Sequence, residues 1–151
     1  MLDVISKFVS DLASEEGSPE FTPSRIQLAQ AALMYHVIAV DGIVTDDERK
    51  RLTDLLIKQF EMEGDEARRL LEQAQKADDE AIDLYGFTSI LKRTLDEEQR
   101  IAIVKNLWEM VFADGIVHEL EDNVVWRIAE LLAVSSRDRV TLKQRVRDKY
   151  S

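Results

Sequence analysis

The sequence predicts an all-α fold, a multihelical bundle of about seven helices with an internal two-fold repeat of helix, Asp-Gly turn and helix. Three observations support this prediction. Apolar residues recur every three or four positions along most of the chain, and no stretch alternates apolar and polar residues as a strand does. Two prolines and five glycines leave few positions at which a helix must break. A tract of eight residues also occurs twice, 73 positions apart.

The repeated tract reads Asp-Gly-Ile-Val-Thr-Asp-Asp-Glu at 41–48 and Asp-Gly-Ile-Val-His-Glu-Leu-Glu at 114–121. Each copy follows one apolar-periodic run and precedes another, which is typical of a turn between two helices. Two helix pairs related in this way usually pack with their apolar faces together. We therefore expect both turns to lie toward one end or one side of the bundle.

The chain divides into three parts. Residues 1–15 form an amphipathic helix, which we expect to pack on the domain; the alternative is a loosely held segment that touches a membrane surface or a partner. Residues 16–24 are a linker, and residues 25–151 form the helical domain. At 151 residues, 45% of them hydrophobic, the chain is long enough for one domain with a substantial core.

The first helix of the domain is expected to start at Thr22-Pro23, a hydroxyl cap followed by proline at the first helical position. It runs to about Val40, and Gly42 ends it because glycine tolerates a left-handed backbone. Its predicted buried stripe is Ile26, Ala29, Leu33, Val37 and Val40.

The next helix begins with a capping box formed by Thr45 and Glu48. Its inward residues are predicted to be Leu52, Leu55, Leu56 and Phe60.

Two further helices are expected at about 65–76 and 79–94, with three acids, Asp78, Asp79 and Glu80, at the start of the second. The inward residues of that second helix are predicted to be Ile82, Tyr85, Phe87, Ile90 and Leu91.

The second half of the domain repeats the pattern. Asp96 and Gln99 cap a helix that runs to Ala113, a helix follows at about 119–133, and Ser135 caps a last, basic helix. Trp108 and Trp126 are expected in the core.

Composition limits the function. The chain has no cysteine, which excludes disulfides, zinc–thiolate sites and thiol catalysis. The net charge of −10 argues against nucleic acid as a general partner. Residues 135–151 carry six basic and two acidic residues, and we expect them to pair with the acidic body or to face water. No run of 18 apolar residues occurs and the first residues are not typical of a secretory signal, so we expect a cytoplasmic protein with at most peripheral membrane contact.

The repeated tract has the spacing of the second half of an EF-hand loop, in which a glycine makes the sharp turn and a glutamate closes on calcium. Gly42, Val44 and Glu48 match this spacing, as do the equivalent residues of the second copy. The first half fails, because apolar residues occupy the first two ligand positions of both copies (Val37, Ala39, Met110 and Phe112). Neither tract is an EF-hand.

A shared site remains open. If the two turns face each other, the acids that both copies retain converge, and a divalent cation (Ca²⁺, Mg²⁺ or Mn²⁺) offsets their repulsion. The candidate metal ligands are Asp41, Glu48, Asp114 and Glu121. The alternative is structural, because Asp-Gly is a common turn and Glu48 suits a capping box with Thr45. In the second copy His118 replaces the threonine and caps poorly, yet Glu121 keeps its spacing. His36 is expected to be packed or hydrogen-bonded, and His118 could be a ligand or a pH switch.

Several local patterns add to the repeat: Ala-Val-Asp-Gly-Ile-Val and Glu within 39–48, Asp-Leu-Tyr-Gly-Phe-Thr at 83–88, Asp-Glu-Glu-Gln-Arg at 96–100, Leu-Trp-Glu through Ala-Asp-Gly to Glu-Leu-Glu within 107–121, and Arg-Ile-Ala-Glu-Leu-Leu at 127–132. In this order they resemble the tellurite-resistance TerB-like family over about residues 25–134. The resemblance implies an all-helical bundle, a divalent-cation site at the acidic turns, and a role in tellurite or general stress response in bacteria.

The sequence is compatible with three functions. The first is a non-enzymatic module that binds or senses a divalent cation through the two acidic turns. The second is an interaction scaffold whose turns are structural and whose surface or basic tail recruits a protein partner. The third is a metal-dependent hydrolase. The sequence leaves the oligomeric state open, and without cysteine the chain cannot reduce or chelate tellurium through thiols.

Overall fold

The structure is a computed structural model that describes residues 24–40, 42–113 and 119–150. These ranges hold seven α-helices and no strand, so the all-α prediction is confirmed, while the internal two-fold repeat stays a prediction. The predicted helix at 1–15, and the linker up to residue 23, lie outside the described residues. The helices are α2 (Arg25–Ile38), α3 (Asp46–Phe60), α4 (Gly64–Glu80), α5 (Tyr85–Thr94), α6 (Glu97–Phe112), α7 (Glu119–Leu131) and α8 (Ser136–Lys149).

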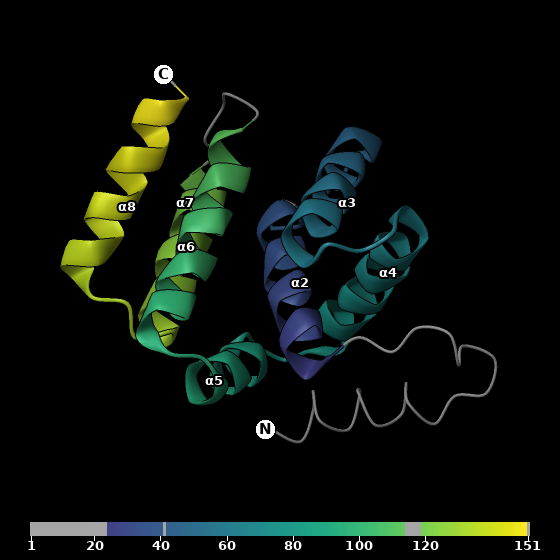
Figure 1. The fold of residues 1–151 in the computed structure, drawn as a ribbon, viewed down its shortest axis with the longest axis horizontal. Helices are drawn as coiled ribbons and strands as arrows, with labels where there is room; N and C mark the ends of the chain where they lie inside the picture. The colour runs from purple at the N-terminus through teal and green to yellow at the C-terminus, as the bar shows by residue number, and fades with distance from the viewer. Residues whose placement is uncertain (1–23, 41, 114–118, 151) are drawn as a thin grey trace.

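Helix α2 is the centre of the bundle and packs against α3, α4, α5, α6 and α7. Figure 1 shows α3 and α4 on one side of it, with α6, α7 and α8 standing side by side on the other. Helix α5 crosses below and carries the chain from the first group to the second. The two helix pairs that flank the repeated tracts, α2–α3 and α6–α7, therefore lie next to each other.

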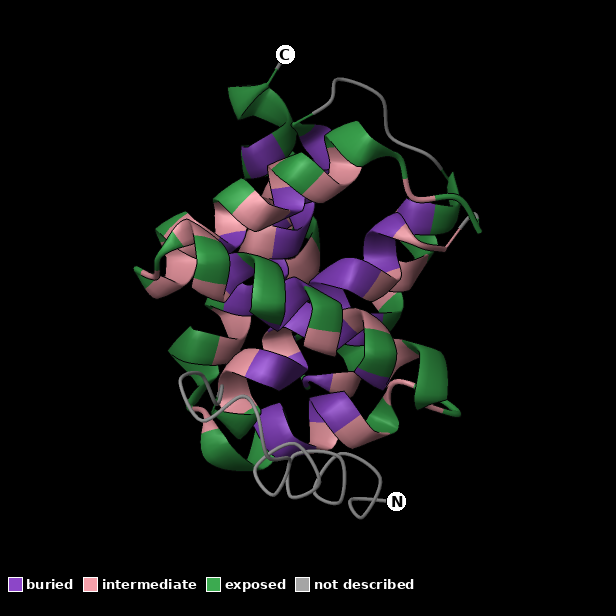
Figure 2. Ribbon diagram, turned by 90° about the vertical axis from the view of Figure 1, so that its right-hand side faces the viewer, coloured by how far each residue is buried: buried purple, intermediate pink, exposed green. Residues whose placement is uncertain are grey.

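The central position of α2 follows from its composition, because a helix that is apolar on all sides must be covered on all sides. Its buried residues are Leu28, Ala29, Ala31, Ala32, Leu33, Met34, Tyr35, Val37 and Ile38. The predicted single stripe was too narrow, and its end members Ile26 and Val40 are only half-buried. Figure 2 shows the buried residues on the inner faces of the helices.

Most helix starts agree with the sequence. Thr45 and Glu48 form the predicted capping box of α3, Asp96 and Gln99 form that of α6, and Ser135 caps α8. The start of α2 was predicted wrongly. Ser24 caps it in place of Thr22-Pro23, because its hydroxyl accepts the Gln27 amide at 3.0 Å while the Gln27 side chain accepts the Ser24 amide.

The boundary between α4 and α5 was also wrong. Helix α4 continues to Glu80, so the acids at 78–80 form its last turn rather than the first turn of the next helix. Ala74 and Ala77 extend its apolar face, and Asp78 bonds to α2, which together favour the longer helix. Ile82 falls in the connection and is 92% exposed, and Tyr85 is 51% exposed at the start of α5, so neither lies in the core.

The basic helix α8 packs along α6 and pairs with the acidic body, as expected for part of its charge. The Lys143 Nζ lies 2.6 Å from the Asp122 Oδ1 of α7, and the Lys149 Nζ lies 3.3 Å from the Glu109 Oε1 of α6. Lys143 also lies over the ring of Trp108, which is fully buried as predicted. Trp126 is only half-buried and forms an edge contact with Trp108.

No helix in the described part of the chain has the length and apolar character needed to cross a membrane.

Candidate functional site

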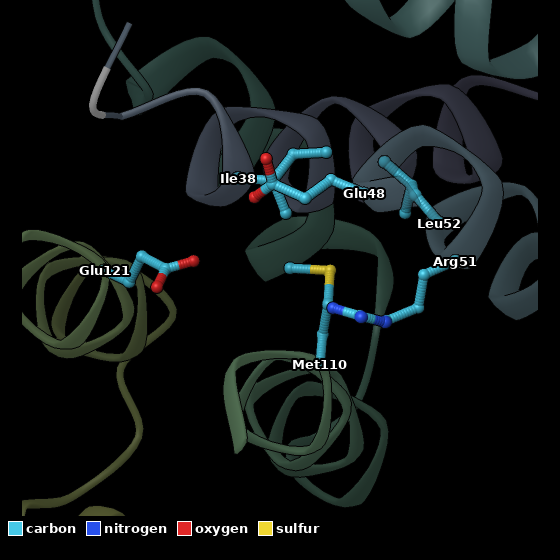
Figure 3. Close-up of a pocket in the computed structure, with 6 residues that line it drawn as sticks. All are labelled: Ile38, Glu48, Arg51, Leu52, Met110 and Glu121. Carbon is cyan, nitrogen blue, oxygen red and sulfur yellow. The ribbon is translucent and has the colours of Figure 1, made fainter. Parts of the chain in front are cut away.

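A small cavity lies where the two repeated tracts lead into their second helices. Its lining combines residues of α2, α3, α6 and α7: Ile38, Glu48, Arg51, Leu52, Met110 and Glu121. In Figure 3 the side chains of Glu48 and Glu121 extend from opposite sides toward the same space. Two glutamates that are 73 positions apart in the sequence thus line one cavity.

The cavity is narrow. Its volume is about 10 Å³, which leaves room for about one water molecule or one small ion. Ile38, Leu52 and Met110 supply apolar walls and are themselves buried. An organic ligand does not fit in this space, whereas a single ion does.

Glu48 caps the start of α3 and also lines the cavity. It is the third residue of α3, and its Oε1 accepts the Thr45 amide at 3.0 Å and the Thr45 hydroxyl at 3.1 Å. The Thr45 hydroxyl oxygen in turn accepts the Glu48 amide at 3.1 Å. The capping box therefore holds the Glu48 carboxylate at the start of α3, next to the cavity.

Glu121 is the equivalent third residue of α7 and is only 7% exposed. Burying an ionised carboxylate is costly unless nearby positive charge or hydrogen bonds compensate it. The amino end of α7 supplies part of that compensation, because the helix dipole is positive there. Glu121 is thus the most strongly buried acid at the site.

Arg51 brings a positive charge to the same lining. It lies one turn after Glu48 on α3, and in Figure 3 its side chain extends toward Met110. The cavity therefore combines two carboxylates with one guanidinium. Arg51 does not stand out when the two copies of the tract are compared, because the equivalent position in the second copy is Val124. Its spacing of three from Glu48 on one helix face was the available signal.

The turn before α3 has the predicted left-handed glycine. Gly42 has a φ of +85°, and an added Cβ there would meet no atom within 4 Å. The position favours glycine because of its backbone conformation and not because of crowding. Three residues named from the sequence, Asp41, Asp114 and His118, lie outside the described residues.

Among residues 24–40, 42–113 and 119–150, no group of three or more histidine, aspartate or glutamate side chains is placed to hold a metal ion. Calcium takes six to eight oxygen ligands and magnesium takes six. Glu48 and Glu121 supply at most four oxygens, so an ion between them needs water or further side chains as well.

A second polar group joins α2 to α4. The His36 Nδ1 lies 2.8 Å from the Asp78 Oδ1, which confirms His36 as a hydrogen-bonded histidine. Its neighbour Tyr35 is buried, and burial raises the pKa of its hydroxyl above 10.0. The negative charges of Asp79 and Asp78 also raise this pKa, and Arg49 lowers it. The hydrogen bond between His36 and Asp78 therefore links α2 to α4.

Together these features define a class of protein: a small all-α domain in which two related acidic helix starts face one cavity. The sequence model of tellurite resistance protein TerB matches residues 27–144. The chain therefore belongs to the TerB family, as the resemblance indicated. Comparison with curated proteins and with solved structures gave no match.

Proposed function

We propose that this TerB-family domain is a non-enzymatic module that binds one divalent cation between its two repeated tracts. The observation that supports it is the presence of Glu48 and Glu121 in the lining of a single ion-sized cavity. Divalent Ca²⁺, Mg²⁺ and Mn²⁺ all favour carboxylate oxygens. Asp41 and Asp114, at the start of each tract, are proposed as the remaining protein ligands, with water completing the shell.

The electrostatics favour a cation. Two carboxylates facing one narrow space repel each other, and the single guanidinium of Arg51 offsets one of the two charges. With Asp41 and Asp114 as the proposed further ligands the surplus would be three negative charges, and a divalent ion would offset two of them. Binding would tie the start of α3 to the start of α7 and so couple the two halves of the bundle.

The cavity favours the binding of an ion over the catalytic turnover of a substrate. The cavity has room for about one ion, and its walls are apolar apart from the charged residues, so a substrate has no place beside the metal. We therefore propose a sensing or structural role for the ion. The family name places TerB proteins in tellurite resistance, and we propose a stress-related role for this chain that does not use thiol chemistry.

The second candidate is an interaction scaffold with structural turns. It is favoured by the hydrogen bonds that Glu48 already forms with Thr45 and by the guanidinium of Arg51 at the same cavity. In that case the acids cap helices and pair internally, and any partner binds elsewhere. A scaffold retains its partners after chelation, whereas a cation-sensing module does not.

Thermal unfolding with each cation separates these functions. An ion at about 100 times its Kd stabilises the folded state by about 2.7 kcal/mol, which raises the midpoint by about 5–10 °C for a domain of this size. The comparison uses sodium chloride at matched ionic strength, because general screening also stabilises a chain of net charge −10. The double variant Glu48→Gln/Glu121→Gln should lose the shift.

The matched controls are Asp46→Asn and Asp47→Asn, which remove one acid each from the exposed side of the same first turn of α3. Both should retain the shift. The absence of a shift with all three cations, or an equal loss in the controls, would count against the site and in favour of the scaffold.

A further inference from the structure

We propose that a cleft between α6 and α8 binds a phosphate group, separately from the cation cavity. The cleft has a volume of about 270 Å³ and is lined by Lys105, Glu109, Leu142, Arg145, Val146 and Lys149. It is too large for a single ion alone and fits a phosphate attached to a small organic group. Nothing in the proposed cation site depends on it.

The way in which α6 and α8 are aligned determines which charged side chains line the cleft. Helices α6 and α8 pack against each other and run in the same direction in Figure 1. Lys149 reaches Glu109 across the cleft at 3.3 Å, a pair 40 residues apart. Lys105 and Arg145 have the same separation and lie one turn earlier on each helix. Two cations therefore face the same stretch of the cleft, below an ion pair that takes up its one carboxylate.

This local excess of positive charge is unusual for the molecule, since the whole chain carries −10. Other basic residues of α8 are used in packing: Lys143 pairs with Asp122, and Arg139 lies over the ring of Trp126. Within the described part of the chain, no ion pair is found for Lys105 or Arg145. Neighbouring like charges are unfavourable, and an anion between them would remove that cost.

The chemistry of the lining points to phosphate. The planar guanidinium of Arg145 can donate two parallel hydrogen bonds to phosphate oxygens, while Lys105 supplies a compact charge. Leu142 and Val146 are buried and form an apolar floor for a carbon group next to the phosphate. Such a group could belong to a soluble phosphomonoester or to a phospholipid headgroup, and the chemistry of recognition is the same in both.

The test is a titration of the full chain, followed by amide nitrogen–proton NMR. Inorganic phosphate and glycerol 3-phosphate are added at constant ionic strength, and binding to phosphatidylcholine vesicles with and without phosphatidic acid is measured by sedimentation. We expect saturable shifts confined to the cleft. Lys105→Gln and Arg145→Gln should each weaken binding by about tenfold, the loss typical of one charge-assisted hydrogen bond.

Arg137→Gln is the matched control, because Arg137 is an exposed cation of α8 outside the cleft. It should change affinity by less than about twofold. All substituted side chains are exposed, and unchanged melting midpoints would show that the variants fold. Vesicle binding that needs both Lys105 and Arg145 would assign the phosphate to a lipid, and soluble binding alone would assign it to a free ester. No saturable shift up to on the order of 50 mM, or an equal loss in Arg137→Gln, would overturn the proposal.

Discussion

At the scale of single residues, Glu48 shows how one side chain serves both fold and site. Its Oε1 closes the capping box with Thr45, while the same carboxylate lines the cavity shared with Glu121. Arg51 lies at the same place and supplies an internal positive charge. In the proposed cation complex, the ion would compete with a guanidinium for the same carboxylates, which would make Arg51 a determinant of its affinity.

Replacing Arg51 with glutamine should strengthen cation binding. The substitution removes a positive charge that repels the ion and competes for Glu48 and Glu121. We expect the Kd for Mn²⁺ to fall by about tenfold, which corresponds to about 1.4 kcal/mol, measured by isothermal titration calorimetry. Lys50→Gln is the control, because Lys50 is an exposed cation on the same helix that does not line the cavity. An unchanged Kd in Arg51→Gln would show that the arginine does not compete with the ion.

Tyr35 makes the stability of the domain sensitive to alkaline pH. Burial, followed by the charge of Asp79, raises the pKa of its hydroxyl above 10.0 in the folded state. The folded chain therefore holds this proton more tightly than the unfolded chain does. The resulting stability is fully present below pH 10 and is lost as the pH rises through the raised pKa.

Urea unfolding between about pH 9 and about pH 11 measures this effect. The free energy of unfolding should fall less steeply with pH in Tyr35→Phe than in the unaltered chain. Tyr85→Phe is the matched control, since Tyr85 is 51% exposed, and its slope should equal that of the unaltered chain. Equal slopes in all three proteins would show that Tyr35 does not titrate differently on unfolding.

At the scale of helices, capping was the most predictable feature, because it depends on residues three apart. Thr45 with Glu48, Asp96 with Gln99, and Ser135 all start the helices that their spacing indicated. The junction of α4 and α5 was not predictable locally. Acids at 78–80 suit a helix start, yet Asp78 bonds to His36 of α2, which is 42 positions away. A tertiary contact there prevails over a local preference.

The helix cap and the proposed cation site can be tested separately at the start of α3. Thr45→Ala removes the hydroxyl that accepts the Glu48 amide, and the free energy of unfolding should fall by about 1 kcal/mol. The Glu48 carboxylate remains, so the melting shift with a divalent cation should persist. Glu48→Gln should instead lose most of that shift. Complete loss of the shift in Thr45→Ala would mean that the carboxylate cannot be positioned without its cap.

At the scale of the whole molecule, the sequence predicted both turns toward one end or one side of the bundle, because helix pairs with related apolar faces pack together. Glu48 and Glu121, the last residues of the two tracts, line one cavity, whereas Asp41 and Asp114 lie outside the described residues. Two features could not be predicted from the sequence. The all-round burial of α2 depends on five neighbouring helices, and the entry of Arg51 into the cavity breaks the equivalence of the two copies.

The most direct test of the central claim is a crystal structure of the chain with saturating Mn²⁺, with the ion located by its anomalous scattering. We predict one anomalous peak in the cavity, within coordinating distance of an oxygen of Glu48 and an oxygen of Glu121, with the guanidinium of Arg51 displaced from the ion. A cavity without a peak, in crystals soaked at a concentration that saturates other carboxylate sites, would contradict the proposal.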